Sequence, residues 1–139
     1  MSFEEKSTWV TLMAFLLAYS WYFLTMLTGI QESSVADLPY RGVMLGTVIG
    51  LVSIIVVSHV VIAAMAPDES DEVDERDREI KRRGEYVGGY VATAAALTGM
   101  GMAMYEIEHF WIANTILLVL VLSEIVSSLV KIYCYRRGF

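Results

Sequence analysis

An acidic and a basic side chain, Glu124 and His59, lie deep within long apolar stretches of this chain. Such groups are rare in segments that contact lipid, because removing a charge from water is costly, and they commonly mark ion or proton pathways. An imidazole beside a carboxylate can accept and release a proton near neutral pH. The pair therefore suggests proton or cation handling, and the alternative is a polar clasp that only holds helices together.

The depth of these groups can be counted along each predicted helix at about 1.5 Å per residue. From the outer ends, Glu124 lies about 20 Å down and His59 about 24 Å down, with Thr93 in the same layer. Helical spacing also places Leu117 and Val121 on the face of Glu124, which is expected to point away from lipid. The candidate ion-handling residues are Glu124, His59, Thr93, Asn114, Ser128 and Lys131.

A second acidic and basic pair, Glu106 and His109, has the Glu-x-x-His spacing that places both side chains on one helix face in di-iron bundles. Such a site needs further carboxylates, and Glu124 lies about 20 Å away in depth. These two residues are therefore weak metal candidates, and the alternative is a polar turn at the outer surface. The sequence has no phosphate-binding loop, nucleophile elbow or zincin motif, so we expect neither an enzyme nor a cofactor.

Four apolar stretches must position these groups, and they span residues 9–28, 43–66, 86–105 and 110–132. Each reaches the roughly 20 residues that a helix needs to cross about 30 Å of hydrocarbon. The chain is 56% hydrophobic with a mean hydropathy of +0.55, whereas soluble domains are about 45–50% apolar. The sequence predicts an all-α integral membrane four-helix bundle, a single domain over residues 1–139 that contacts the lipid bilayer.

The charges outside the stretches indicate the orientation of the chain. Lysine and arginine gather in the link at 67–85 and in the C-terminal tail, and are almost absent from the other two connections. By the positive-inside rule, both termini and the link at 67–85 face the cytoplasm. The net charge of −6 and the lack of a basic stripe predict no nucleic-acid partner.

Small residues recur every three or four positions in the second and third stretches, which allows another helix to approach closely. The predicted packing residues are Gly42, Gly46 and Gly50 in one helix, and Gly88, Ala92 and Gly99 in the other. Whether each stripe meets a helix of the same chain or of a second copy stays open. Because one chain is too small to enclose a wide pathway, we expect a homo-oligomer.

The link at 67–85 contains acidic residues four positions before basic ones, an arrangement that favours a helix. We expect a short cytoplasmic helix that breaks at Gly84 before the third stretch. The segment is either a solvated connector or a docking site for a cytoplasmic protein. The candidate docking residues are Asp74, Asp77, Arg78, Lys81 and Arg83.

The runs DERDREIKRRGEYVGGY, HFWIANTILLVLVLSEIV and YRRG cover roughly the second half of the chain, residues 74–138. In these runs the chain resembles a family of small bacterial integral membrane proteins with four predicted helices. The resemblance implies a four-helix inner-membrane protein and carries no activity with it.

Two functions follow from the residues. The first is an oligomeric channel or transporter-like protein that moves a proton or cation past Glu124. The second is a membrane subunit or sensor that transports nothing and docks a partner through the charged link.

Overall fold

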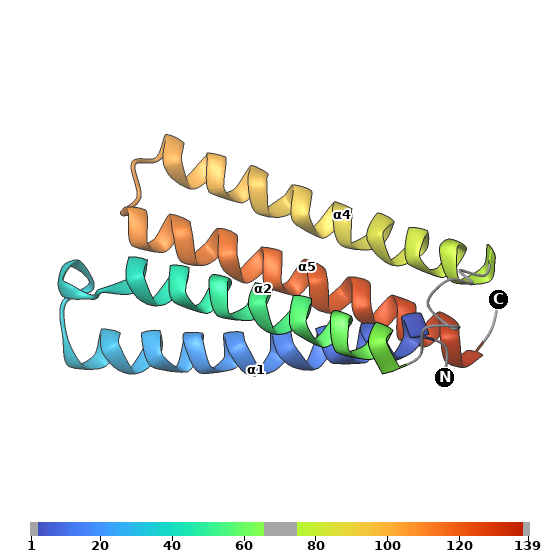
Figure 1. Cartoon of the computed structure of the whole chain (residues 1–139). Coiled ribbons are helices and arrows are strands. Elements are labelled where there is room, and N and C mark those ends of the chain that lie inside the picture. The colour runs from blue at the N-terminus through green and yellow to red at the C-terminus, as the bar shows by residue number, and fades with distance from the viewer. Residues whose placement is uncertain (1–2, 66–74, 138–139) are drawn as a thin grey trace.

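The computed structural model describes residues 3–65 and 75–137, and these ranges are almost entirely helical without a strand. Four long helices carry them (Figure 1): α1 (Phe3–Glu32), α2 (Tyr40–Met65), α4 (Glu75–Met104) and α5 (His109–Arg137). A short 3₁₀ helix, η1 (Val35–Asp37), lies between α1 and α2. The predicted all-α four-helix bundle is confirmed.

The helices pack in the order α4, α5, α1 and α2, with α5 and α1 in the middle. Successive neighbours in this order run antiparallel, so that α1 begins and α5 ends at the same end of the bundle (Figure 1). Within the described ranges, α2 and α4 do not pack extensively on each other. These two helices are therefore the edges of the array.

Apolar side chains cover the outside of the bundle as well as its interior. On α2 only Thr47 and Leu51 are buried, whereas Ile49, Val57 and Val60 expose about 60% of their surface. All four helices are long and apolar enough to cross a membrane. Helices that are apolar all round are stable in lipid and not in water, so the chain is a multi-pass membrane protein that contacts lipid.

The main core lies among α1, α2 and α5. Its buried members are Tyr19, Tyr22, Met26, Leu51, Phe110, Leu117 and Val121. Near the connection from α1 to α2, the ring of Tyr40 meets Phe110 edge to face, with the centroids 5.0 Å apart. Helix α4 contributes no residue to this cluster. It packs on α5 through small residues instead.

Small residues allow α4 to lie directly against α5. A Cβ atom built on Gly88 would lie 3.0 Å from Ser127 Cβ and 3.1 Å from the backbone oxygen of Ser123. The hydroxyl of Ser123 also donates a hydrogen bond of 2.8 Å to the carbonyl of Gly88. The stripe on α4, where Ala92 is half-buried and Gly99 buried, therefore packs within the chain.

The glycines of α2 behave differently. Gly42, Gly46 and Gly50 are exposed, and a Cβ atom on any of them would meet nothing within 4 Å. They line an apolar groove of about 680 Å³ between α1 and α2. The two stripes that look alike in the sequence thus have different surroundings.

The predicted break at Gly84 is wrong, because α4 runs without interruption from Glu75 to Met104. Gly84 is buried, and the aliphatic part of Lys131 lies directly over it. Because Gly84 has no side chain, α4 can approach α5 closely at this position. The glycine does not end the helix. The charged segment that the structure describes therefore continues as one helix into the apolar stretch at 86–105, and Asp74 lies outside the described residues.

Candidate functional site

Glu124 lies on α5 between the surface that packs on α4 and the surface that packs on α1. Val121, Ser127 and Ser128, three or four residues away, are all buried, yet Glu124 is exposed. No hydrogen bond or ion pair joins its carboxylate to residues in 3–65 or 75–137. The described part of one chain therefore leaves this carboxylate open on a strip of helix whose two sides are covered.

His59 on α2 is bound to α1. Its Nδ1 atom lies 2.8 Å from the carbonyl oxygen of Ile55, and its Nε2 atom is hydrogen-bonded to the hydroxyl of Ser7. Because a carbonyl only accepts, Nδ1 donates to Ile55, whereas the Ser7 hydroxyl can donate to Nε2 or accept from it. The imidazole thus joins α1 to α2.

The structure does not bring Glu124 and His59 together, contrary to our expectation. Ile125, the residue after Glu124, lies beside Phe15 of α1, whereas His59 meets Ser7. The separation of Ser7 and Phe15 along α1 corresponds to about 12 Å of depth. A similar predicted depth did not make the two residues neighbours, because within the described ranges α2 packs on α1 and does not pack extensively on α5.

Asn114 belongs to a buried polar contact nearer the end of the bundle where α5 begins. The hydroxyl of Tyr22, which is fully buried, donates to Asn114 Oδ1 at 2.9 Å. Asn114 Nδ2 donates in turn to the carbonyl of Phe110 at 2.8 Å. This contact joins α1 to α5 and satisfies the polar groups inside the core, so it is a structural clasp.

The other expected members of the polar layer are dispersed. Thr93 is exposed on α4, and its hydroxyl donates to the carbonyl of Gly89 at 2.9 Å, within its own helix. Ser128 is buried on α5 and Lys131 is half-buried beside α4. Only Glu124 among the candidates is both exposed and without a polar partner in the described part of the chain.

Tyr22→Phe is expected to lower the free energy of unfolding by about 1 kcal/mol, since Asn114 Oδ1 would lose its donor inside the core. Unfolding of the purified protein in mixed detergent micelles measures this change. The control is Tyr105→Phe, because Tyr105 is 85% exposed and should leave stability unchanged. Equal effects of the two variants would contradict a stabilising role for the clasp.

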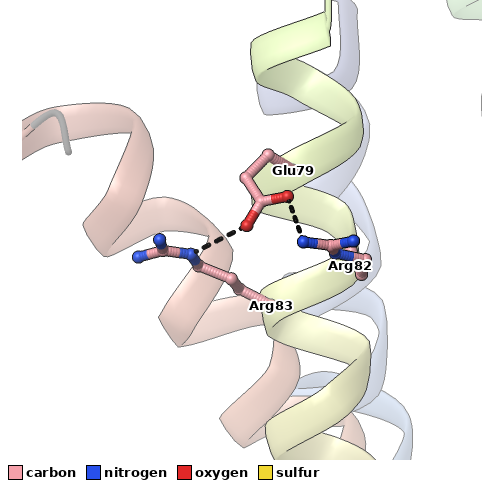
Figure 2. A network of polar contacts seen from close by, with 3 residues as sticks. All are labelled: Glu79, Arg82 and Arg83. Carbon is pink, nitrogen blue, oxygen red and sulfur yellow. Dashed lines mark hydrogen bonds and ion pairs between the residues drawn. The ribbon is translucent and has the colours of Figure 1, made fainter.

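The charged beginning of α4 carries an ion-pair cluster (Figure 2). Glu79 Oε1 lies 3.3 Å from Arg83 Nε, and Glu79 Oε2 lies 2.7 Å from Arg82 Nη2. The expected pairing of Glu79 with Arg83 is present, and Arg82 adds a second contact. The hydrogen bond from Arg83 is the main cause that lowers the pKa of Glu79 from its ordinary 4.5, with desolvation opposing it and Arg82 adding to it.

Because the folded-state pKa of Glu79 is depressed, its stabilising contribution is present above pH 4.5 and is lost as the pH falls through the lowered pKa. We expect a carboxyl NMR titration of Glu79 to report a pKa below 4.5. In the Arg83→Gln variant the pKa should move upward, because the largest cause of the shift is removed. An unchanged titration in that variant would show that the pair does not persist in solution.

The metal candidates do not share a helix face. Glu106 lies in the connection between α4 and α5 with a positive φ of 54°, and His109 begins α5. The amide of Glu106 bonds to the carbonyl of Ala103, and the amide of Ile107 to that of Met102, a capping pattern that ends α4. The helical Glu-x-x-His arrangement is therefore not formed, and the described residues contain no group of three metal-ligating side chains.

Sequence reasoning missed two contacts of the polar residues. Ser7 was not recognised as the partner of His59, nor Ser123 as a donor to α4. No local sequence pattern predicts either contact, because each contact joins two helices. The rotation and register of one helix relative to another arise from their packing. At the same end of the bundle, Arg136 also lies over the ring of Trp9, with 5.5 Å between guanidinium carbon and centroid.

No family model, curated protein or solved structure matches this chain.

Proposed function

We propose that this multi-pass membrane protein forms an oligomer that conducts protons or cations past Glu124, in a bacterial inner membrane with both termini in the cytoplasm. The observation that carries the proposal is the exposed carboxylate of Glu124, without a polar partner among the described residues, in the middle of a membrane-spanning helix. The positive charge at the end where α1 begins and α5 ends supports the orientation.

The energy of an uncovered carboxylate favours an assembly over a single chain. Placing an acidic residue at the centre of a membrane helix costs at least about 2.5–3.5 kcal/mol on insertion scales. Glu124 avoids that cost when its open side faces water or polar groups of another copy. In the described ranges, α2 and α4 are edge helices that do not pack extensively on each other. We therefore expect a neighbouring copy of the chain to cover the open side of Glu124.

His59 has a lesser role than Glu124 in this proposal. It is hydrogen-bonded to Ser7, near the beginning of α1, at the end of the bundle where α5 ends (Figure 1). We assign the main titrating role to Glu124, because His59 already has two polar partners.

The proposal is tested by flux into proteoliposomes that contain purified protein. An imposed proton or potassium gradient should decay faster than in protein-free vesicles, with the rate rising as the protein density increases. No excess decay for either ion would contradict conduction. Crosslinking in the same vesicles checks the oligomer, because a purely monomeric protein would also contradict the proposal.

A second candidate function is partner docking by the start of α4. Arg78, Lys81 and Arg82 are exposed on this segment, which is a helical continuation of the membrane span. A rigid charged helix suits a cytoplasmic protein better than a flexible link does. Capture of a protein that depends on Asp77, Arg78, Lys81 and Arg83, together with absent flux, would favour docking over conduction.

A further inference from the structure

One face of the last part of α5 combines an apolar groove with two arginines at the end of the helix. The groove has a volume of about 560 Å³ and is lined by Leu129, Val130, Ile132, Tyr133, Arg136 and Arg137. Its apolar part belongs to the membrane-spanning segment, and its arginines lie in the last turn of the helix. We propose that this face binds an anionic phospholipid, with the phosphate at Arg136 and Arg137 and an acyl chain along Leu129 and Tyr133.

The two guanidinium groups are held in place by aromatic rings. Arg136 lies over Trp9 with a separation of 5.5 Å from the centroid, and Arg137 lies 5.4 Å from the centroid of Tyr133. Arg137 Nη1 is also 3.5 Å from the Tyr133 hydroxyl. Within the described ranges, no carboxylate forms an ion pair with either arginine. No carboxylate of the described ranges therefore competes for their planar N–H donors with a phosphate, which guanidinium binds in bidentate fashion.

The apolar path continues from this groove toward the middle of the membrane. A second groove, of about 360 Å³, lies between α1 and α5 and includes Leu118, Leu122 and Ile125. Steps of three and four residues align the two grooves along one face of α5. From Arg136 to Leu118 the face is about 27 Å long, enough for an extended acyl chain. The residues in order are Leu118, Leu122, Ile125, Leu129, Tyr133 and Arg136.

Charge and polarity together favour an anionic lipid over the other ligands that such a face could take. A neutral lipid would cover the apolar groove but would not neutralise the charges of Arg136 and Arg137. A free phosphate would bind the two arginines but would not cover the apolar groove. Basic residues near a membrane surface gain about 1 kcal/mol each from anionic lipids, and this site has two of them in fixed positions.

The test is lipid binding to the full-length protein in detergent, followed by native mass spectrometry. Phosphatidylglycerol and phosphatidylcholine with identical acyl chains are titrated against wild type and the Arg136→Gln/Arg137→Gln variant. We expect wild type to prefer phosphatidylglycerol and the variant to bind it about 30-fold more weakly, the ratio that corresponds to about 2 kcal/mol. The matched control is Arg76→Gln/Arg78→Gln, which removes two exposed arginines of α4 and should retain wild-type binding.

Several outcomes would overturn the assignment. These are unchanged phosphatidylglycerol binding in the Arg136→Gln/Arg137→Gln variant, an equal loss in the Arg76→Gln/Arg78→Gln control, and equal binding of the two lipids by wild type. Displacement of the lipid by millimolar inorganic phosphate would instead indicate an anion site without an acyl path. Circular dichroism checks the fold of each variant, and Arg136→Lys/Arg137→Lys should show intermediate binding because it keeps charge but loses the planar donors. The assay is independent of ion conduction.

Discussion

Gly88→Leu is expected to lower the free energy of unfolding by about 3 kcal/mol. Even a Cβ atom at Gly88 would approach backbone and side-chain atoms of α5 to about 3.0 Å, so the rest of a leucine has no space. Separating the helices also breaks the bond from Ser123 to the Gly88 carbonyl. Unfolding in mixed detergent micelles provides the measurement.

Gly89→Leu is the matched control, since it places the same side chain one residue further along the same helix. A Cβ atom there meets nothing within 4 Å, and the position is exposed. We expect unchanged stability or a gain of about 0.5–1 kcal/mol, because glycine is a poor residue for a helix interior. Similar losses in both variants would mean that the α4–α5 contact does not hold the bundle together.

Glu124→Gln is expected to reduce ion flux by at least about 100-fold, the lower range for removing a positioned proton-transfer group. Glutamine keeps the size and polarity of the side chain but can neither bind a proton nor attract a cation by charge. Its helix and neighbours should be unaffected, since Glu124 has no polar partner in the described part of the chain. Proteoliposome flux under a fixed gradient measures the effect, normalised to the amount of protein reconstituted.

Two controls separate loss of the carboxylate from loss of the protein. Glu124→Asp keeps a carboxylate at the same level and should retain measurable flux. Glu108→Gln removes an exposed carboxylate just before α5 and should conduct like wild type. If wild type conducts and Glu124→Gln conducts equally well, ions pass through the protein by a path that does not include this residue.

The membrane character and the helices were predictable because they depend on local properties. A stretch of about 20 apolar residues is both helical and lipid-soluble wherever it lies in a fold, so all four helices were recognised. The helix ends were less well predicted. Gly84 was expected to break the chain, yet the same lack of a side chain allows close packing, and only the presence of Lys131 over it distinguishes these two uses.

The candidate site was predicted in part. The sequence identifies Glu124 as an unusual charge in a span, and the structure leaves it exposed beside buried neighbours. The partner proposed for it was wrong, because His59 meets Ser7. Depth along a helix does not reveal which helices are neighbours, and within the described ranges α2 packs on α1 and does not pack extensively on α5.

The glycine stripes show most clearly what the amino-acid sequence determines and what the tertiary structure decides. Spacing alone determines that Gly42, Gly46 and Gly50 share one helix face and that Gly88 and Gly99 share another, since helical geometry is the same in every context. Only the packed structure decides that α4 uses its stripe against α5 while the stripe of α2 stays open. The physical reason is that contacts with neighbouring helices set the rotation of a helix about its axis. A residue pattern within one helix does not specify which helices those neighbours are.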